Sequence, residues 1–179
     1  MSKSYTLQVA GLTRELPLCP VNEHLDIAAF IMFSDVELTI ACAAELNRIA
    51  PEHDVIITAE SKGIPLAYEM SRQSGKKYLL ARKSAKLYMS DPIRVEVKSI
   101  TTARIQELYI DRLDITSIKD KRVLIVDDVI STGESLNALE SLVDQAGGKV
   151  VARMAVLAEG DAAERTDIQF LAKLPVFPK

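Results

Sequence analysis

The chain has 179 residues, of which 48% are hydrophobic and 26% charged, and its net charge is −3 at pH 7. This size and composition are typical of one folded domain with a substantial core. The negative charge argues against a protein that coats nucleic acid, and two cysteines are too few for a disulfide framework. There is no apolar export segment and no apolar run of membrane-spanning length, so we expect a cytoplasmic protein that binds neither nucleic acid nor membrane.

Two helices are expected in the first half of the chain. The first covers residues 34–50, because Ser34 and Glu37 form a capping box and apolar residues then recur on one helical face. The second opens at Pro65 and ends at Gly75, as the preferences of proline and glycine at helix ends indicate.

Short apolar runs alternate with the helices and predict buried strands. They lie at residues 54–58, 78–81, 123–127 and 150–157. Residues 93–98 alternate apolar and charged side chains, which is typical of a half-exposed strand. This order predicts an α/β fold with a mostly parallel sheet flanked by helices, and such sheets bind ligands beyond the carboxyl ends of their strands.

The most informative segment reads VLIVDDVISTGES, at residues 123–135. An apolar strand ends in Asp127 and Asp128, a turn of small residues follows, and an amphipathic helix then runs to Gly147. The amides of such a turn and helix start attract phosphate, and two adjacent carboxylates suit the neighbouring hydroxyls of a ribose. The segment therefore predicts a site for a phosphorylated sugar.

Other interpretations of this segment fit less well. A receiver domain of two-component signalling also has paired acids after an apolar strand, but the chain after Asp128 is too short for its four further strand–helix units. A purely structural strand end, with Ser131 or Thr132 capping the helix, leaves the paired acids unexplained. The GxxxxGK[ST] and GxGxxG patterns of nucleotide-binding loops do not occur.

Residues 123–135 resemble the 5-phosphoribosyl-1-pyrophosphate (PRPP) signature of type I phosphoribosyltransferases. The resemblance implies the fold of that family, as a single domain with a core at about 34–158 and a small hood from about 1–33 and 159–179. It also implies that Asp127 and Asp128 are catalytic and hold the ribose. The implied PRPP-binding residues after them are Val129, Ile130, Ser131, Thr132, Gly133, Glu134 and Ser135.

Two further segments resemble the pyrophosphate-binding loops of adenine phosphoribosyltransferases. Residues 60–63 are similar to that family's Glu-Ala-Arg-Gly loop, with a lysine in place of the arginine, and residues 82–87 are similar to its Arg-Lys-x-x-Lys-Leu run. The implied pyrophosphate-binding residues are Glu60, Ser61, Lys62, Gly63, Arg82, Lys83 and Lys86. From the residues alone, a simple turn and a solvated basic surface stay open. In relatives, an arginine of this run reaches the neighbouring subunit, which implies a homodimer.

Residues 98–106 take the place of the family's flexible catalytic loop. The form KSITTA is closer to xanthine phosphoribosyltransferases and to the purine-operon repressor than to adenine enzymes. Lys98 and Arg104 are the candidate catalytic residues of this loop, and Ser99, Thr101 and Thr102 are its other candidate contacts.

The resemblance places base recognition at Asn22 and His24 near the N-terminus and at Glu159 near the C-terminus. From the residues alone, Asn22 could equally cap a turn and His24 could equally be an exposed histidine without a role. The expected reaction transfers 5-phosphoribosyl from PRPP to a purine, with Mg²⁺ held through PRPP rather than by the protein directly. Adenine is the expected base. The alternatives are a 6-oxopurine (xanthine or hypoxanthine) and a non-catalytic protein that senses PRPP.

Overall fold

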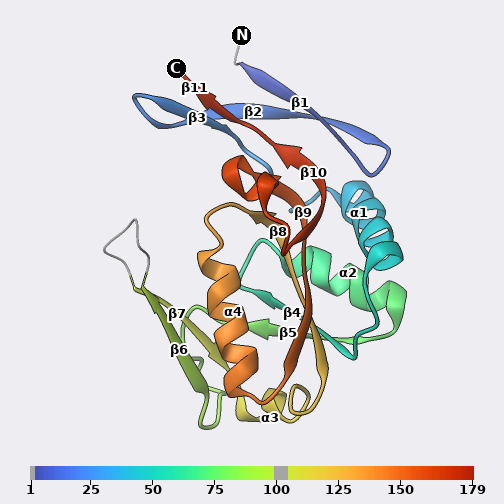
Figure 1. The fold of residues 1–179 in the computed structure, drawn as a ribbon, viewed down its shortest axis with the longest axis vertical. Coiled ribbons are helices and arrows are strands. Elements are labelled where there is room, and N and C mark those ends of the chain that lie inside the picture. Colours follow the sequence, from blue (N-terminus) through green and yellow to red (C-terminus); the bar gives the residue numbers. More distant parts are fainter. Residues whose placement is uncertain (1–2, 99–104) are drawn as a thin grey trace.

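The computed structural model describes residues 3–98 and 105–179, and the side chains of 97, 98, 105 and 106 lie outside that description (Figure 1). At its centre is a sheet of five parallel strands in the order β10-β9-β8-β4-β5. These strands are β4 (Val55–Ala59), β5 (Lys77–Ala81), β8 (Arg122–Ile130), β9 (Lys149–Glu159) and β10 (Gln169–Leu174). The predicted α/β fold with a parallel sheet is confirmed.

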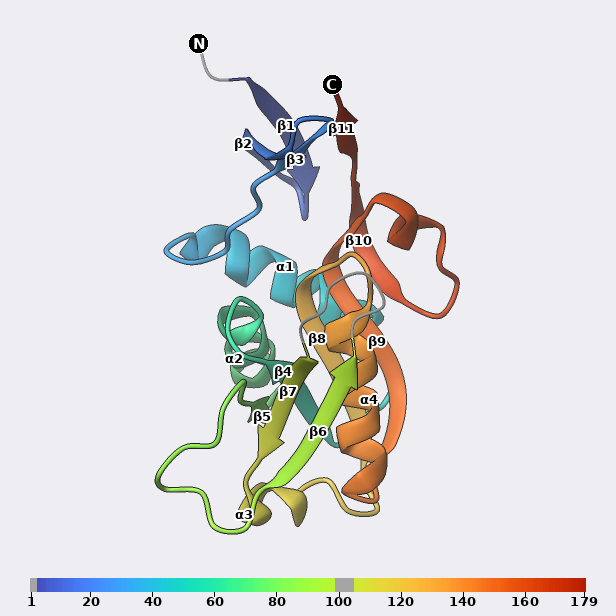
Figure 2. The ribbon, with the colours of Figure 1, turned by 90° about the vertical axis from the view of Figure 1, so that its left-hand side faces the viewer.

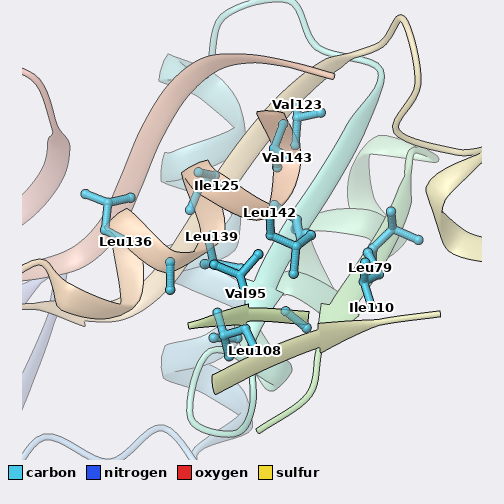
Figure 3. Packing of buried hydrophobic residues seen from close by; sticks show 14 of the residues in the cluster. Leu79, Val95, Leu108, Ile110, Val123, Ile125, Leu136, Leu139, Leu142 and Val143 are labelled. Atoms are coloured by element: carbon cyan, nitrogen blue, oxygen red, sulfur yellow. The ribbon is translucent and has the colours of Figure 1, made fainter. Parts of the chain in front are cut away.

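Side-chain alternation along β8 creates two apolar layers, because successive residues of a strand point to opposite faces. Val123 and Ile125 face α4 (Glu134–Gln145) and the hairpin of β6 (Ile93–Lys98) and β7 (Ile105–Ile110), where the cluster in Figure 3 packs. Leu124 and Val126 belong to the cluster on the opposite face. There the helices α1 (Val36–Ile49) and α2 (Ile64–Ser74) cover the sheet.

A second, four-stranded sheet lies above the first and contains strands from both ends of the chain (Figures 1 and 2). Its strands are β1 (Ser4–Val9), β2 (Leu12–Asn22), β3 (Leu25–Ala28) and β11 (Val176–Pro178), in that order. We call it the hood sheet. β10 falls within the range expected for the hood but pairs with β9 in the central sheet.

The short elements α3 (Arg112–Ile115) and η1 (Gly160–Glu164) complete the described secondary structure. Among the described residues, no helix is long and apolar enough to cross a membrane.

Two local details differ from expectation. The cap of α1 is Asp35, whose carboxylate accepts the amide of Leu38 at 3.0 Å, because Ser34 has a left-handed backbone (φ 69°) and lies one residue too early. The capping box of Ser34 and Glu37 is therefore wrong. Strand β8 also continues past the acids to Ile130 instead of ending at 127, since it pairs with β9 as far as Ala158.

Candidate active site

Strand β8 presents its two acids to opposite faces of the sheet. Asp127 continues the alternation of Val123 and Ile125, whereas Asp128 continues that of Leu124 and Val126. Asp127 accordingly lines a small cavity of about 50 Å³ at the start of α4. Asp128 lines a larger cavity of about 280 Å³ beneath the hood sheet. One pair of neighbouring residues thus serves two adjacent cavities.

The small cavity is built by the loop that joins β8 to α4. Gly133 is the helix cap and has a positive φ of 80°, a conformation that glycine adopts without steric cost. The turn leaves the first amides of α4 without partners in the helix, and the positive end of the helix lies there. The lining residues are Asp127, Val129, Ile130, Ser131, Thr132, Gly133, Glu134, Ser135 and Leu136. The structure therefore brings all the predicted PRPP-binding residues except Asp128 around one anion-sized cavity.

The two carboxyls are electrostatically disfavoured as a pair of anions. Burial first, and then the charge of Asp128, raises the pKa of Asp127 to about 8. Burial also raises the pKa of Asp128, a residue that is 4% exposed. Within residues 3–98 and 105–179, Oδ2 of Asp128 has no hydrogen-bond partner. Hydroxyl donors or a cation brought by a ligand would satisfy this pair.

The loop after β4 packs directly against these acids. A Cβ added to Gly63 would lie 2.3 Å from Oγ1 of Thr58 and 3.1 Å from Oδ1 of Asp127, so only glycine fits there. Thr58 is buried, and its Oγ1 has no partner in the described part of the chain. The sequence interpretation assigned no role to Thr58; a polar residue at the end of an apolar strand was the available signal. The peptide bond between Glu60 and Ser61 is cis.

Glu60 links this loop to the basic run after β5. Its carboxylate accepts the amide of Lys83 at 3.0 Å and lies 3.3 Å from Arg82 and 3.7 Å from Lys86. The amide of Lys83 is the largest cause that lowers the pKa of Glu60, so the group is an anion. The Glu60 carboxylate therefore holds these cations together, and the predicted role of Glu60 toward pyrophosphate stays a prediction. Lys62 lines the larger cavity.

The larger cavity differs from the predicted base site in part. Glu159 lines it opposite the segment 27–31, as predicted, and burial raises the pKa of its carboxyl. Asn22 and His24 do not line it: they form the exposed turn between β2 and β3, where Oδ1 of Asn22 accepts the amide of His24 at 2.8 Å. The cavity lies at the other end of β3, which explains the difference. The complete lining is Ile27, Ala28, Ala29, Phe30, Ile31, Lys62, Asp128, Val129, Ser131, Glu159 and Leu174.

The predicted catalytic loop cannot be placed in this site. Ser99, Thr101, Thr102 and Arg104 lie outside the described residues, as does the side chain of Lys98. The structure shows only that the backbones of Lys98 and Ile105 pair at the end of the β6–β7 hairpin.

Comparisons with known proteins agree on one family. The family described as phosphoribosyl transferase domain matches residues 37–173. A hypoxanthine/guanine phosphoribosyltransferase of Methanotorris igneus is 35% identical over 88% of this chain and 83% of its own. An adenine phosphoribosyltransferase of Acetivibrio thermocellus is 36% identical over 77% of this chain and 80% of its own. The crystal structure of an adenine phosphoribosyltransferase from Thermoanaerobacter pseudethanolicus has a TM-score of 0.71 at 19% identity, over 88% of this chain and 95% of that one.

Proposed function

The chain belongs to the phosphoribosyl transferase domain family, and on this premise we propose that it transfers 5-phosphoribosyl from PRPP to a purine base. The products are a nucleoside monophosphate and pyrophosphate. Its relatives include adenine and hypoxanthine/guanine enzymes, which supports a purine as the acceptor.

The observation that carries the proposal is the junction of the two cavities. Val129 and Ser131 line both of them, and the two acids stand on either side of that junction. A phosphate at the start of α4, a ribose at the acids and a purine beneath the hood sheet would therefore be placed in the order in which a nucleotide joins them. The base cavity, at about 280 Å³, is apolar along Ile27, Phe30 and Leu174.

In the proposed reaction, the acidic and the basic residues of the site have separate roles. As the bond from C1′ to the pyrophosphate oxygen breaks, its electron pair leaves with pyrophosphate and positive charge grows on the ribose. Asp127 and Asp128, once ionised, would stabilise that charge, while Lys62, Arg82 and Lys86 would stabilise the departing anion. The base nitrogen then bonds to C1′, and its proton passes to solvent or to pyrophosphate.

Magnesium fits this arrangement as a companion of PRPP. The donor set of the acids suits it, because Oδ2 of Asp128 is buried without a partner in the described residues. Within the same residues there is no group of three or more potential ligand side chains, and we propose that the ion enters the site with PRPP. When bound, the ion neutralises charge on pyrophosphate.

Adenine is the first choice of base, on the resemblance of residues 60–63 and 82–87 to adenine enzymes. The position of one lysine favours a 6-oxopurine as the second candidate. Lys62 lines the base cavity, where its ammonium could donate to the oxygen that replaces the amino group of adenine. The proposal also includes a cytoplasmic homodimer. Exposed apolar side chains at Leu87 and Tyr88, next to the basic run, support an interface there.

The test is pyrophosphate release from PRPP and Mg²⁺, with adenine, hypoxanthine, guanine and xanthine supplied separately. Turnover with one of these bases is the expected result and identifies the acceptor. If no base gives turnover while PRPP still raises the melting temperature, the purine assignment is overturned, and the protein is a PRPP sensor or a transferase with another acceptor.

A further inference from the structure

The phosphate loop, residues 131–135, contains no lysine or arginine, so it offers a bound phosphate no cationic side chain of its own. A phosphate monoester carries about −1.5 to −2 charges at pH 7. The helix start offers the equivalent of only about half a positive charge. A cation from elsewhere in the chain would correct the imbalance.

Arg165 is placed to supply that cation. It follows η1, and its Nε and Nη2 donate to Asp167 at 2.9 and 2.7 Å, a paired contact that fixes the guanidinium plane. The opposite corner, Nη1, faces the phosphate loop: a Cβ added to Gly133 would lie 2.4 Å from it. No feature of the sequence had singled out Arg165, which is more than thirty positions from the PRPP motif's acids.

We propose that Arg165 is the charge-balancing residue of the phosphate loop and selects a ligand with a 5′-phosphate. This inference rests on the proposed function, since it concerns the same site. Arg165 acts across Gly133 on the bound phosphate and is therefore a positioning residue. Asp167 offsets part of the guanidinium charge through Nε and Nη2, so the effect on phosphate depends on Nη1, the nitrogen that Asp167 does not contact and that lies next to Gly133.

The proximity of Arg165 to Gly133 is also compatible with a purely structural role. Arg165 could serve as a wedge that keeps the backbone of Gly133 in its left-handed conformation. A wedge needs bulk and no charge, whereas the proposal needs charge. Two substitutions separate these roles: Arg165→Met keeps an unbranched side chain without the charge, and Arg165→Lys keeps the charge.

The chain offers a matched control at the opposite end of β8. Arg122 makes the same paired contact, from Nε and Nη2 to Asp54 at 3.1 and 2.8 Å, and lies at the start of the strand that leads into the phosphate loop. Arg122→Met changes the net charge as much as Arg165→Met does. It therefore controls for the overall charge of the protein and for the loss of an ion pair.

The experiment measures the Kd of ribose 5-phosphate and of pyrophosphate by calorimetry, and kcat and KM for PRPP. For Arg165→Met we expect the Kd of ribose 5-phosphate and the KM of PRPP to rise about tenfold or more, with the Kd of pyrophosphate and kcat within about twofold. Arg165→Lys should recover most of the affinity, and Arg122→Met should match the wild type.

Three results would overturn the inference. Unchanged ribose 5-phosphate binding in Arg165→Met removes any role in affinity. Equal losses in the methionine and lysine variants indicate a shape requirement instead of a charge requirement. A wild type that binds neither ribose 5-phosphate nor PRPP overturns the proposed function, and this inference falls with it.

Discussion

The small cavity at the start of α4, which is the proposed phosphate cavity, and the larger cavity beneath the hood sheet, which is the proposed base cavity, share Val129 and Ser131 but are assembled in different ways. All the residues that line the phosphate cavity lie between 127 and 136, one continuous stretch of chain. The base cavity takes its walls from segments far apart in the sequence. These are residues 27–31, Lys62, the three residues Asp128, Val129 and Ser131, Glu159 and Leu174.

This difference in assembly matches the two proposed roles: the small cavity would hold the sugar phosphate that reacts, and the larger cavity would recognise the base. A continuous loop between a strand and a helix is fixed largely by its own backbone, so one motif can encode it. The base cavity depends on how the hood sheet sits on the core. Arg14 of β2 helps to fix that arrangement through its contacts with Asp35, the cap of α1, at 2.7 Å and with Glu37 at 2.7 Å. Changes at the loop should therefore affect every base equally, and changes at the hood should affect bases selectively.

The largest effect is expected at the acids. The double variant Asp127→Asn with Asp128→Asn should lose roughly a thousandfold or more of ribosyl transfer with every base, because it removes the carboxyl groups that, once ionised, oppose positive charge on the ribose. Pyrophosphate release at saturating PRPP measures the loss, and a thermal melt checks the fold. Turnover within tenfold of wild type would show that the acids are not the reaction centre.

The same acids should make stability depend on pH. Since the folded-state pKa of Asp127 is raised from 3.8 to about 8, its protonated form is favoured in the native protein. The stability that protonated Asp127 gives the folded protein is present in full below about pH 4 and is lost as pH rises through 8. As pH rises from 5 to 9, the free energy of unfolding of the Asp127→Asn variant should therefore fall less than that of the wild type, as urea unfolding at each pH would measure. Parallel curves for the two proteins would contradict the burial of this charge.

On the base side, Phe30 offers the sharpest test. Phe30→Leu should raise the KM of the base by about tenfold and leave the KM of PRPP within twofold, because an apolar wall of the base cavity is reduced. Phe177→Leu is the control: Phe177 also belongs to the hood sheet but contacts the ring of Tyr5, with centroids 5.5 Å apart. An equal change in both variants would mean that the hood loosens as a whole.

Glu159 should set the choice among bases. Glu159→Gln replaces a carboxyl, whose pKa is raised by burial, with an amide that both donates and accepts. The ratio of kcat/KM for adenine to that for hypoxanthine should change by about tenfold, with the KM of PRPP unchanged. A constant ratio, measured with both bases in competition, would exclude Glu159 from base selection.

The smallest effect is expected at the turn between β2 and β3. Asn22→Ala and His24→Ala should each leave kcat/KM for the base within twofold, because neither residue lines the base cavity. The Asn22 variant loses one exposed hydrogen bond and should lose less than about 1 kcal/mol of stability. A selective loss of activity with one base would restore these two residues to the base site.

The sequence predicted the central sheet well because each buried strand must satisfy two apolar layers at once. The runs at 54–58 and 123–127 could hardly have another role once helices alternate with them. The PRPP motif was likewise readable, since its residues are contiguous. These local signals led to the family, which the comparisons confirm.

The hood sheet and the base cavity could not be predicted in the same way. Strand β2 has mostly exposed or half-buried side chains and contains Pro17 and Pro20, so it lacks the pattern of a buried strand. The role of residues 27–31 appears only when β3 is paired with β11 at the other end of the chain. Arg165 was missed for the same reason, because its contact with Gly133 is made in space and not in sequence.

The pairing of Ile27 with Val176 also has a consequence for the order of folding. It closes a loop that spans most of the chain, and such long-range contacts carry a larger entropic cost than the local connection of β8 to α4. In refolding from denaturant, the hood sheet should therefore complete last. A refolding chain would regain its affinity for ribose 5-phosphate before it could distinguish one purine from another.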